Sequence, residues 1–250
     1  MKNKYLENLN KIEFLVTYAC TGRCKHCSEG EHCSAGERID PTLAADAVRK
    51  ISAEYEIKTV MAFGGEPLLY PDAVYAIMSA ATEVGVSRRQ IITNGYFTRD
   101  TEKIKLVARR LFECGVNDLL LSVDAFHQES IPLDVVREFA RAAVGFGIPV
   151  RLQPAWLVSP TDLNSYNEKT REILSSFCDM NLPIGEGNVV FFEGNAKKYL
   201  SEYFDKNMPE NPYIEDPCNV KCISFEPNGN VFDKNLYKSD VMEIIRNYTP

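Results

Sequence analysis

The sequence predicts an α/β fold, a partial (β/α)6 barrel of parallel strands that ends in a short C-terminal hairpin and helix. Short apolar runs alternate with segments whose apolar residues recur every three or four positions, which is typical of strands alternating with amphipathic helices. About six such units follow one another, fewer than the eight of a closed barrel. The run 119–123 is nearly all apolar, as expected of a parallel strand covered on both faces. A chain of 250 residues is long enough for one such barrel.

The strand-helix units can be followed in order along the chain. The first apolar run, 12–16, is expected to be a strand, and Asp40-Pro41 supplies an N-cap and a first-turn proline for the helix after it. The apolar stripe of this helix consists of Ala44, Val48, Ile51 and Tyr55. The other expected strands are 59–63, 91–93, 119–123, 150–152 and 189–192. The other expected helices are 74–81, 104–111, 135–144, 168–177 and 196–203.

Two regions of different character are expected. Residues 1–206 should form the barrel core, and residues 207–250 a linker and a short, cysteine-containing extension. The linker is expected at 207–217, which is rich in proline and polar residues. In the extension, the Pro-Asn-Gly-Asn sequence at 227–230 is a turn signal between two extended pieces, which predicts a hairpin. A short helix at 240–246 should follow it.

Composition and charge exclude several classes of protein. The apolar share of 45% and the charged share of 25% match an ordinary globular protein. The polar start and the lack of any run of roughly 18 apolar residues predict a cytoplasmic protein without a membrane partner. In that reducing compartment, the eight cysteines are expected to be thiols or metal ligands. The net charge of −7 argues against a nucleic-acid partner.

Three cysteines stand close together in TYACTGRCKHCSEG, directly after the first expected strand. They are Cys20, Cys24 and Cys27. Four thiolates would close a zinc or iron-sulfur site, whereas three leave one metal position free. A 4Fe-4S cluster held by these cysteines would therefore have one iron open to an exogenous ligand. A zinc knuckle or free thiols are the alternatives that the triplet alone leaves open.

The second expected strand ends in Gly64-Gly65-Glu66-Pro67. The carboxyl ends of parallel strands meet at one edge of a sheet, so this loop is expected beside the cysteine loop. Two glycines let a ligand approach the backbone closely, and the Glu66 carboxylate offers acceptors for an ammonium group. A simple turn is the alternative for this segment alone.

Together, the cysteine loop and the Gly-Gly-Glu strand end resemble the radical S-adenosylmethionine (SAM) superfamily, over about residues 12–195. The resemblance implies that Cys20, Cys24 and Cys27 hold a 4Fe-4S cluster and that Gly64, Gly65 and Glu66 bind the methionine amino group of SAM. It also implies chelation of the open iron by SAM, reductive cleavage to a 5′-deoxyadenosyl radical, and hydrogen abstraction from a substrate. A reductant such as flavodoxin or ferredoxin is the implied partner.

Four further residues agree with this resemblance. Asn94 lies in a Thr-Asn-Gly turn like that of the family, and Ser122 and Asp124 end the fourth strand, where the family places polar groups near the ribose or carboxylate of SAM. His26 precedes the third cysteine, where the family has an aromatic residue near the adenine. The alternatives are polar residues that cap the next turn and, for His26, a solvent-facing loop residue.

Candidates for catalysis are fewer. Cys33 follows the cysteine loop, and its thiol could return a hydrogen atom to a substrate radical. His127 and Glu129 follow the fourth strand on the expected active face, where loops of barrel enzymes carry function. They could bind substrate or handle protons; alternatively, they cap the helix expected near Pro132.

The tail bears on the substrate. Cys218 and Cys222 resemble the start of the C-terminal extension of peptide-modifying members, in which further cysteines hold auxiliary clusters. A complete auxiliary site would need two more ligands, and reduced thiols are the alternative. This resemblance implies a peptide or protein side chain as substrate. A small-molecule substrate, a glycyl-radical activase, and a non-catalytic iron-sulfur or zinc protein are the other functions left open.

Overall fold

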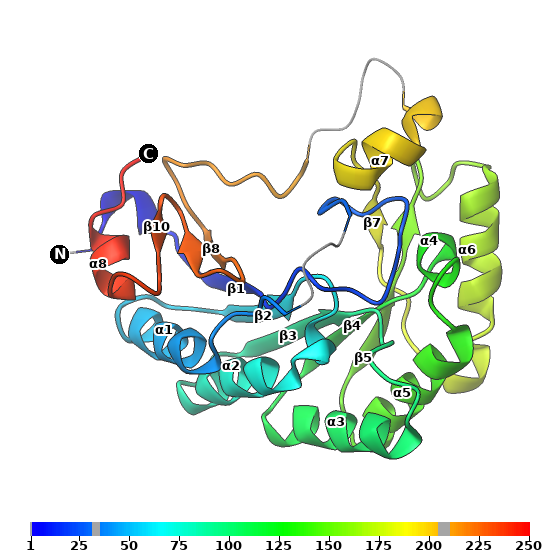
Figure 1. Cartoon of the computed structure of the whole chain (residues 1–250), viewed down its shortest axis with the longest axis horizontal. Coiled ribbons are helices and arrows are strands. Elements are labelled where there is room, and N and C mark those ends of the chain that lie inside the picture. The colour runs from blue at the N-terminus through cyan, green and yellow to red at the C-terminus, as the bar shows by residue number, and fades with distance from the viewer. Residues whose placement is uncertain (1, 32–35, 205–210) are drawn as a thin grey trace.

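A six-stranded parallel sheet forms the centre of the molecule (Figure 1), which the computed structural model describes at residues 2–31, 36–204 and 211–250. The strand order is β5-β4-β3-β2-β1-β8, and every neighbouring pair is parallel. The strands are β1 (Lys11–Leu15), β2 (Thr59–Phe63), β3 (Arg88–Thr93), β4 (Asp118–Ser122), β5 (Val150–Gln153) and β8 (Cys222–Phe225). The expected α/β partial barrel is confirmed.

Most of the long helices pack against the outer face of this sheet, whereas α7 lies on the opposite side (Figure 1). The longer ones are α1 (Pro41–Glu54), α2 (Pro71–Glu83), α3 (Thr101–Glu113), α5 (Leu133–Gly145) and α6 (Ser165–Ser175). The short ones are α4 (Ala125–Gln128), α7 (Gly194–Tyr199), α8 (Val241–Arg246) and the 3-10 turns η1 (Lys4–Leu6), η2 (Pro67–Leu69), η3 (Cys178–Met180) and η4 (Ser201–Tyr203). Asp40 caps α1 as expected, because its carboxylate accepts the Thr42 and Leu43 amides at 2.9 Å. No helix in the described part of the chain has the length and apolarity needed to span a lipid bilayer.

Alternation along β1 separates the two faces of the sheet. Ile12 and Phe14 are fully buried on the helix side, whereas Lys11 and Glu13 are half-buried and line the cavity on the opposite face. Phe225 of β8 stacks on Phe14 with 5.0 Å between ring centroids. The tail strand therefore shares its hydrophobic core with β1.

Two details of the expected strand arrangement are wrong. Residues 189–192 do not supply the sixth strand of the main sheet, because β7 (Asn188–Val189) pairs instead with β6 (Ala155–Trp156). The sixth strand is β8, whose buried Ile223 and Phe225 match the apolar positions of β1. Accordingly, the hairpin does not join 222–225 to the residues after the turn; it joins β9 (Asn230–Val231) to β10 (Lys234–Asn235). The division of the chain at residue 206 stays a prediction.

Candidate active site

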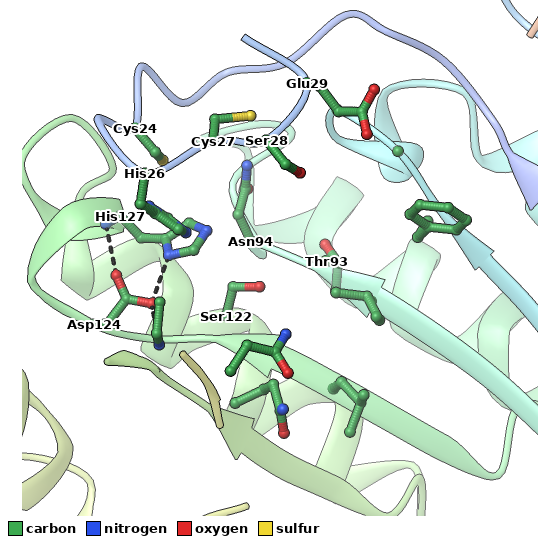
Figure 2. Close-up of a pocket in the computed structure, with 18 of the residues that line it drawn as sticks. Cys24, His26, Cys27, Ser28, Glu29, Thr93, Asn94, Ser122, Asp124 and His127 are labelled. Carbon is green, nitrogen blue, oxygen red and sulfur yellow. Dashed lines mark hydrogen bonds and ion pairs between the residues drawn. The ribbon is translucent and has the colours of Figure 1, made fainter. Parts of the chain in front are cut away.

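A cavity of about 400 Å³ lies against the inner face and the carboxyl ends of the strands (Figure 2). Its wall brings together most of the residues that the sequence singles out. These are Cys20, Cys24, His26, Cys27, Gly64, Gly65, Asn94, Ser122, Asp124 and His127. Glu66 and Glu129 are not part of the wall, and Cys33 lies outside the described residues.

The Gly-Gly turn is packed directly on the start of the cysteine loop. The Gly65 amide donates to Thr17 O at 2.7 Å, and the Glu66 amide donates to Ala19 O at 2.8 Å. A Cβ atom on Gly65 would lie 2.2 Å from Ala19 O, and one on Gly64, which has φ of +142°, would lie 2.6 Å from Thr17 O. The glycines thus allow two loops to meet, in addition to lining the cavity as expected.

Replacing Gly65 with alanine is expected to destabilise the protein by roughly 1 to 3 kcal/mol, because the new methyl group meets a backbone carbonyl that cannot move alone. Gly145, at the end of α5, is the matched control, since a Cβ atom there meets nothing within 4 Å. Gly145→Ala should be neutral or stabilising by up to about 1 kcal/mol. Urea unfolding of both variants measures the difference, and equal stabilities would contradict the role assigned to Gly65.

The three loop cysteines line the cavity in a desolvated setting. Cys24 is buried, and burial raises the pKa of the Cys20 thiol to about 12 and that of Cys24 well above its ordinary value. The Gly22 amide donates to Cys20 Sγ at 3.3 Å, and the Asn94 side-chain amide lies 3.6 Å from the same sulfur. A Cβ atom on Gly22 would lie 3.2 Å from Cys24 Sγ, so glycine keeps the space beside the sulfurs open. This donor set fits a metal cluster, since a coordinated thiol is deprotonated by the metal.

Asp124 orders the opposite wall. Its carboxylate is fully buried, accepts the His127 amide at 2.9 Å and the Ala155 amide at 3.0 Å, and lies 2.8 Å from His127 Nδ1 (Figure 2). Burial alone would raise the pKa of Asp124, but the charge and hydrogen bonds of His127 lower it to about 2. The carboxylate therefore stays ionised and fixes the His127 ring at the cavity.

His26 is packed between the cysteine loop and α4. Its ring centroid lies 4.8 Å from that of Phe126 and 4.9 Å from that of His127. Burial and, to a smaller extent, the neighbouring His127 lower the pKa of His26 to about 4, so its ring is neutral. Within the described ranges, His26 Nδ1 is buried without a hydrogen-bond partner, which fits a cavity that binds a ligand with polar atoms. Stacking on adenine stays a prediction.

Glu66 lies behind the wall rather than in it. The carboxylate is fully buried and accepts the Leu68 amide at 2.9 Å, the Thr93 hydroxyl at 2.7 Å and the Asn94 amide at 2.8 Å. Burial outweighs these hydrogen bonds and raises the pKa of Glu66 to about 7. Glu66 thus ties the end of β2 to the Thr93-Asn94 turn; binding of an ammonium group by its side chain stays a prediction.

The remaining candidates lie apart from the cavity wall. Glu129 is exposed and pairs with Lys25 at 3.0 Å, which ties α4 to the cysteine loop. Cys222 is half-buried beside Glu13, whose charge adds to the effect of burial in raising the pKa of the thiol. Cys218 is exposed, and its neighbour Pro217 accepts the Tyr248 hydroxyl at 3.0 Å. An auxiliary cluster at the two tail cysteines stays a prediction.

Sequence reasoning missed several residues of the wall. Lys11, Glu13, Glu29, Asn188 and Tyr213 all line the cavity. The polar residues within the apolar run KIEFL were a usable signal, because alternation on a strand places Lys11 and Glu13 on the face opposite Ile12 and Phe14.

Comparison with known proteins agrees with this geometry. A protein called "Probable GTP 3′,8-cyclase" from Sulfolobus acidocaldarius is 33% identical over 127 residues, which are 49% of this chain and 37% of that protein. The "GTP 3′,8-cyclase" of Tolumonas auensis is 25% identical over 136 residues, 53% of this chain and 38% of that protein. The chain therefore spans well under half the length of these two curated relatives.

Solved structures share the fold. "Native anSMEcpe with bound AdoMet" superposes with a TM-score of 0.54 at 13% identity, covering 93% of this chain and 76% of that one. "Crystal structure of BtrN in complex with AdoMet and 2-DOIA" superposes with a TM-score of 0.51 at 18% identity, covering 99% and 84%. The family model described as "Radical SAM superfamily" matches residues 14–150, more than half of the chain. The chain therefore belongs to the radical SAM superfamily, whose cofactors are a 4Fe-4S cluster and SAM.

Proposed function

We propose that this radical SAM enzyme acts on a small polar molecule, rather than on the peptide side chain that the tail cysteines suggested. Cys20, Cys24 and Cys27 would hold the cluster. When bound, the cluster and SAM supply the reductive cleavage and the hydrogen abstraction. The chain's own part is to bind and orient: Asn94 and Asp124 lie on the wall beside the cysteines, where they would position SAM.

The bridge across the open side of the barrel carries the proposal. β7 lies beyond the β5 edge of the sheet, and the segment before β8 lies at the opposite edge. Tyr213 joins them, because its hydroxyl donates to Asn188 Oδ1 at 2.7 Å and its ring meets Phe191 edge-on at 6.2 Å. All three residues line the cavity. A mouth narrowed in this way favours a small molecule over a folded protein or a long peptide.

The names of the curated relatives also support a small-molecule substrate. Their printed name describes a reaction of GTP, a small molecule. The substrate side of the cavity also uses the tail, which lies beyond the matched range 14–150. The substrate of this protein can therefore be a small molecule other than GTP.

The test is to reconstitute the protein anaerobically, add SAM and a strong reductant, and measure 5′-deoxyadenosine. We expect slow formation without substrate and faster formation when a low-mass fraction of a cell extract is added. A peptide fraction from the same extract should give no increase. Stimulation by the peptide fraction alone would overturn the small-molecule proposal, and absence of 5′-deoxyadenosine from a protein with full iron content would argue against radical SAM activity.

A further inference from the structure

We infer that the substrate carries a positively charged amine and no phosphate group, an inference that rests on the proposed small-molecule function. It depends on a division of the cavity into two sides. His26, His127 and Asp124 lie on one side with Cys24, whereas Glu29 lies on the other (Figure 2). The first side adjoins the cysteines and the expected SAM contacts. The second side is left for the substrate.

Strand β1 contributes one carboxylate, that of Glu13, to the second side. Glu13 projects from β1 into the cavity wall, and its side chain is 18% exposed. Lys11, two residues earlier on the same face, forms an ion pair with Glu13. The lysine therefore offers no free positive charge to a ligand. Cys222, which pairs with Lys11 in the register of β8 and β1, adds a neutral thiol beside them.

Glu29 supplies an unpaired negative charge at the mouth. Among the residues that the structure describes, no lysine, arginine or histidine lies within ion-pair distance of its carboxylate, although it is part of the cavity wall. The carboxylates of Glu226 and Glu193 lie near enough to the Glu29 carboxylate for their negative charges to repel it. A cationic ligand would relieve the repulsion among these three groups. An anionic ligand would add to it.

Recognition of a phosphate would need free cations, which the described part of the wall lacks. Phosphate sites use Arg or Lys side chains or the amides of a helix N-terminus. Arg23 of the cysteine loop donates to the loop's own carbonyls, Cys20 O and Gly22 O, at 3.1 and 3.0 Å. At the other end of the strands, Arg151 is bound to Asp118 at 3.0 Å. A triphosphate, as in the GTP of the relatives' name, has no matching charge here.

The N-terminus of α4, which adjoins the cavity, is not free either. The Asp124 carboxylate already accepts the His127 amide there. The negative charge of Asp124 would repel a phosphate at this position. The negative charge of Asp124 and its cap on α4 therefore make this wall unfavourable for a phosphate, as is the side that carries Glu29.

The test is equilibrium dialysis of the reconstituted protein, saturated with SAM, against four probes. They are 1,5-diaminopentane, its neutral counterpart 1,5-pentanediol, inorganic triphosphate and GTP. We expect retention of the diamine only. Glu29→Gln should weaken diamine binding roughly tenfold, the effect of losing one charge pair. Glu13→Gln should also weaken it, because it leaves the positive charge of Lys11 uncompensated in the cavity wall. Glu102→Gln, on the exposed face of α3, is the matched control and should bind as the unmodified chain does.

Each outcome decides the inference. Diamine retention that depends on Glu29 and Glu13 supports it. No retention of the diamine, equal retention of diamine and diol, binding of triphosphate or GTP, or unchanged binding in both glutamine variants overturns it. Dialysis needs no turnover, so a failure here is distinct from a failure to form 5′-deoxyadenosine, which would contradict the proposed function itself.

Discussion

Replacing Cys24 with alanine is expected to abolish 5′-deoxyadenosine formation, lowering it by at least roughly a hundredfold. Loss of a residue behind a metal ligand already costs about 10- to 100-fold, and loss of a ligand should cost more. Cys24 is the most deeply buried of the three loop cysteines, and its sulfur lies in the space that Gly22 keeps open. Two remaining thiols cannot hold the cluster that three are expected to hold. Iron content and 5′-deoxyadenosine, measured after identical reconstitution, give the answer.

Cys178→Ala is the matched control for that experiment. Cys178 begins η3 on the surface and is exposed, so its loss should change neither iron content nor 5′-deoxyadenosine. Circular dichroism of both variants would show whether the fold is kept. A Cys24→Ala protein that binds the full complement of iron and forms 5′-deoxyadenosine at the usual rate would remove Cys24 from the cluster.

The cysteine loop and the Gly-Gly turn could be predicted because their signals are local. Spacing within fourteen residues identifies the thiols, and the parallel-sheet rule places the turn after β2 beside them. The position of β8 could not be predicted in the same way, because Lys11 pairs with Cys222 more than 200 residues away. A four-residue strand does not encode its partner, so the turn at 227–230 predicts a hairpin between its neighbours instead.

The roles of the site residues were harder to predict than their presence. The Gly-Gly context identifies Glu66, but the orientation of its side chain depends on Thr93 and Asn94 at the end of another strand. The Tyr213–Asn188 bridge joins two loops with no periodic pattern, so the sequence gives no sign of it. By contrast, Glu13 lies on a regular strand and could have been assigned to the inner face by alternation alone.

Replacing Glu66 with alanine is expected to destabilise the protein by roughly 3 to 5 kcal/mol. The change leaves three buried donors without an acceptor, namely the Leu68 and Asn94 amides and the Thr93 hydroxyl, and it creates a cavity. Asn94 should also shift relative to Cys20, since the Asn94 amide loses its anchor. Urea unfolding measures the stability. Glu102→Ala on the exposed face of α3 is the control and should change stability by less than about 0.5 kcal/mol.

Glu66→Gln separates the charge of this residue from its packing. The pKa of Glu66 is about 7 in the folded protein, above its ordinary value of 4.5, so the folded state holds the proton more tightly than the unfolded state. The stability from this tighter binding is complete below pH 4.5 and is lost as the pH rises through about 7. Glutamine does not titrate, so the unmodified protein should lose about 2 kcal/mol relative to Glu66→Gln between pH 5.5 and pH 7.5. The pKa of Asp124, about 2, lies below this range, so Asp124 does not contribute to the change. A stability difference that stays constant over this range would mean that Glu66 does not change its ionisation between pH 5.5 and pH 7.5, which would contradict a pKa of about 7.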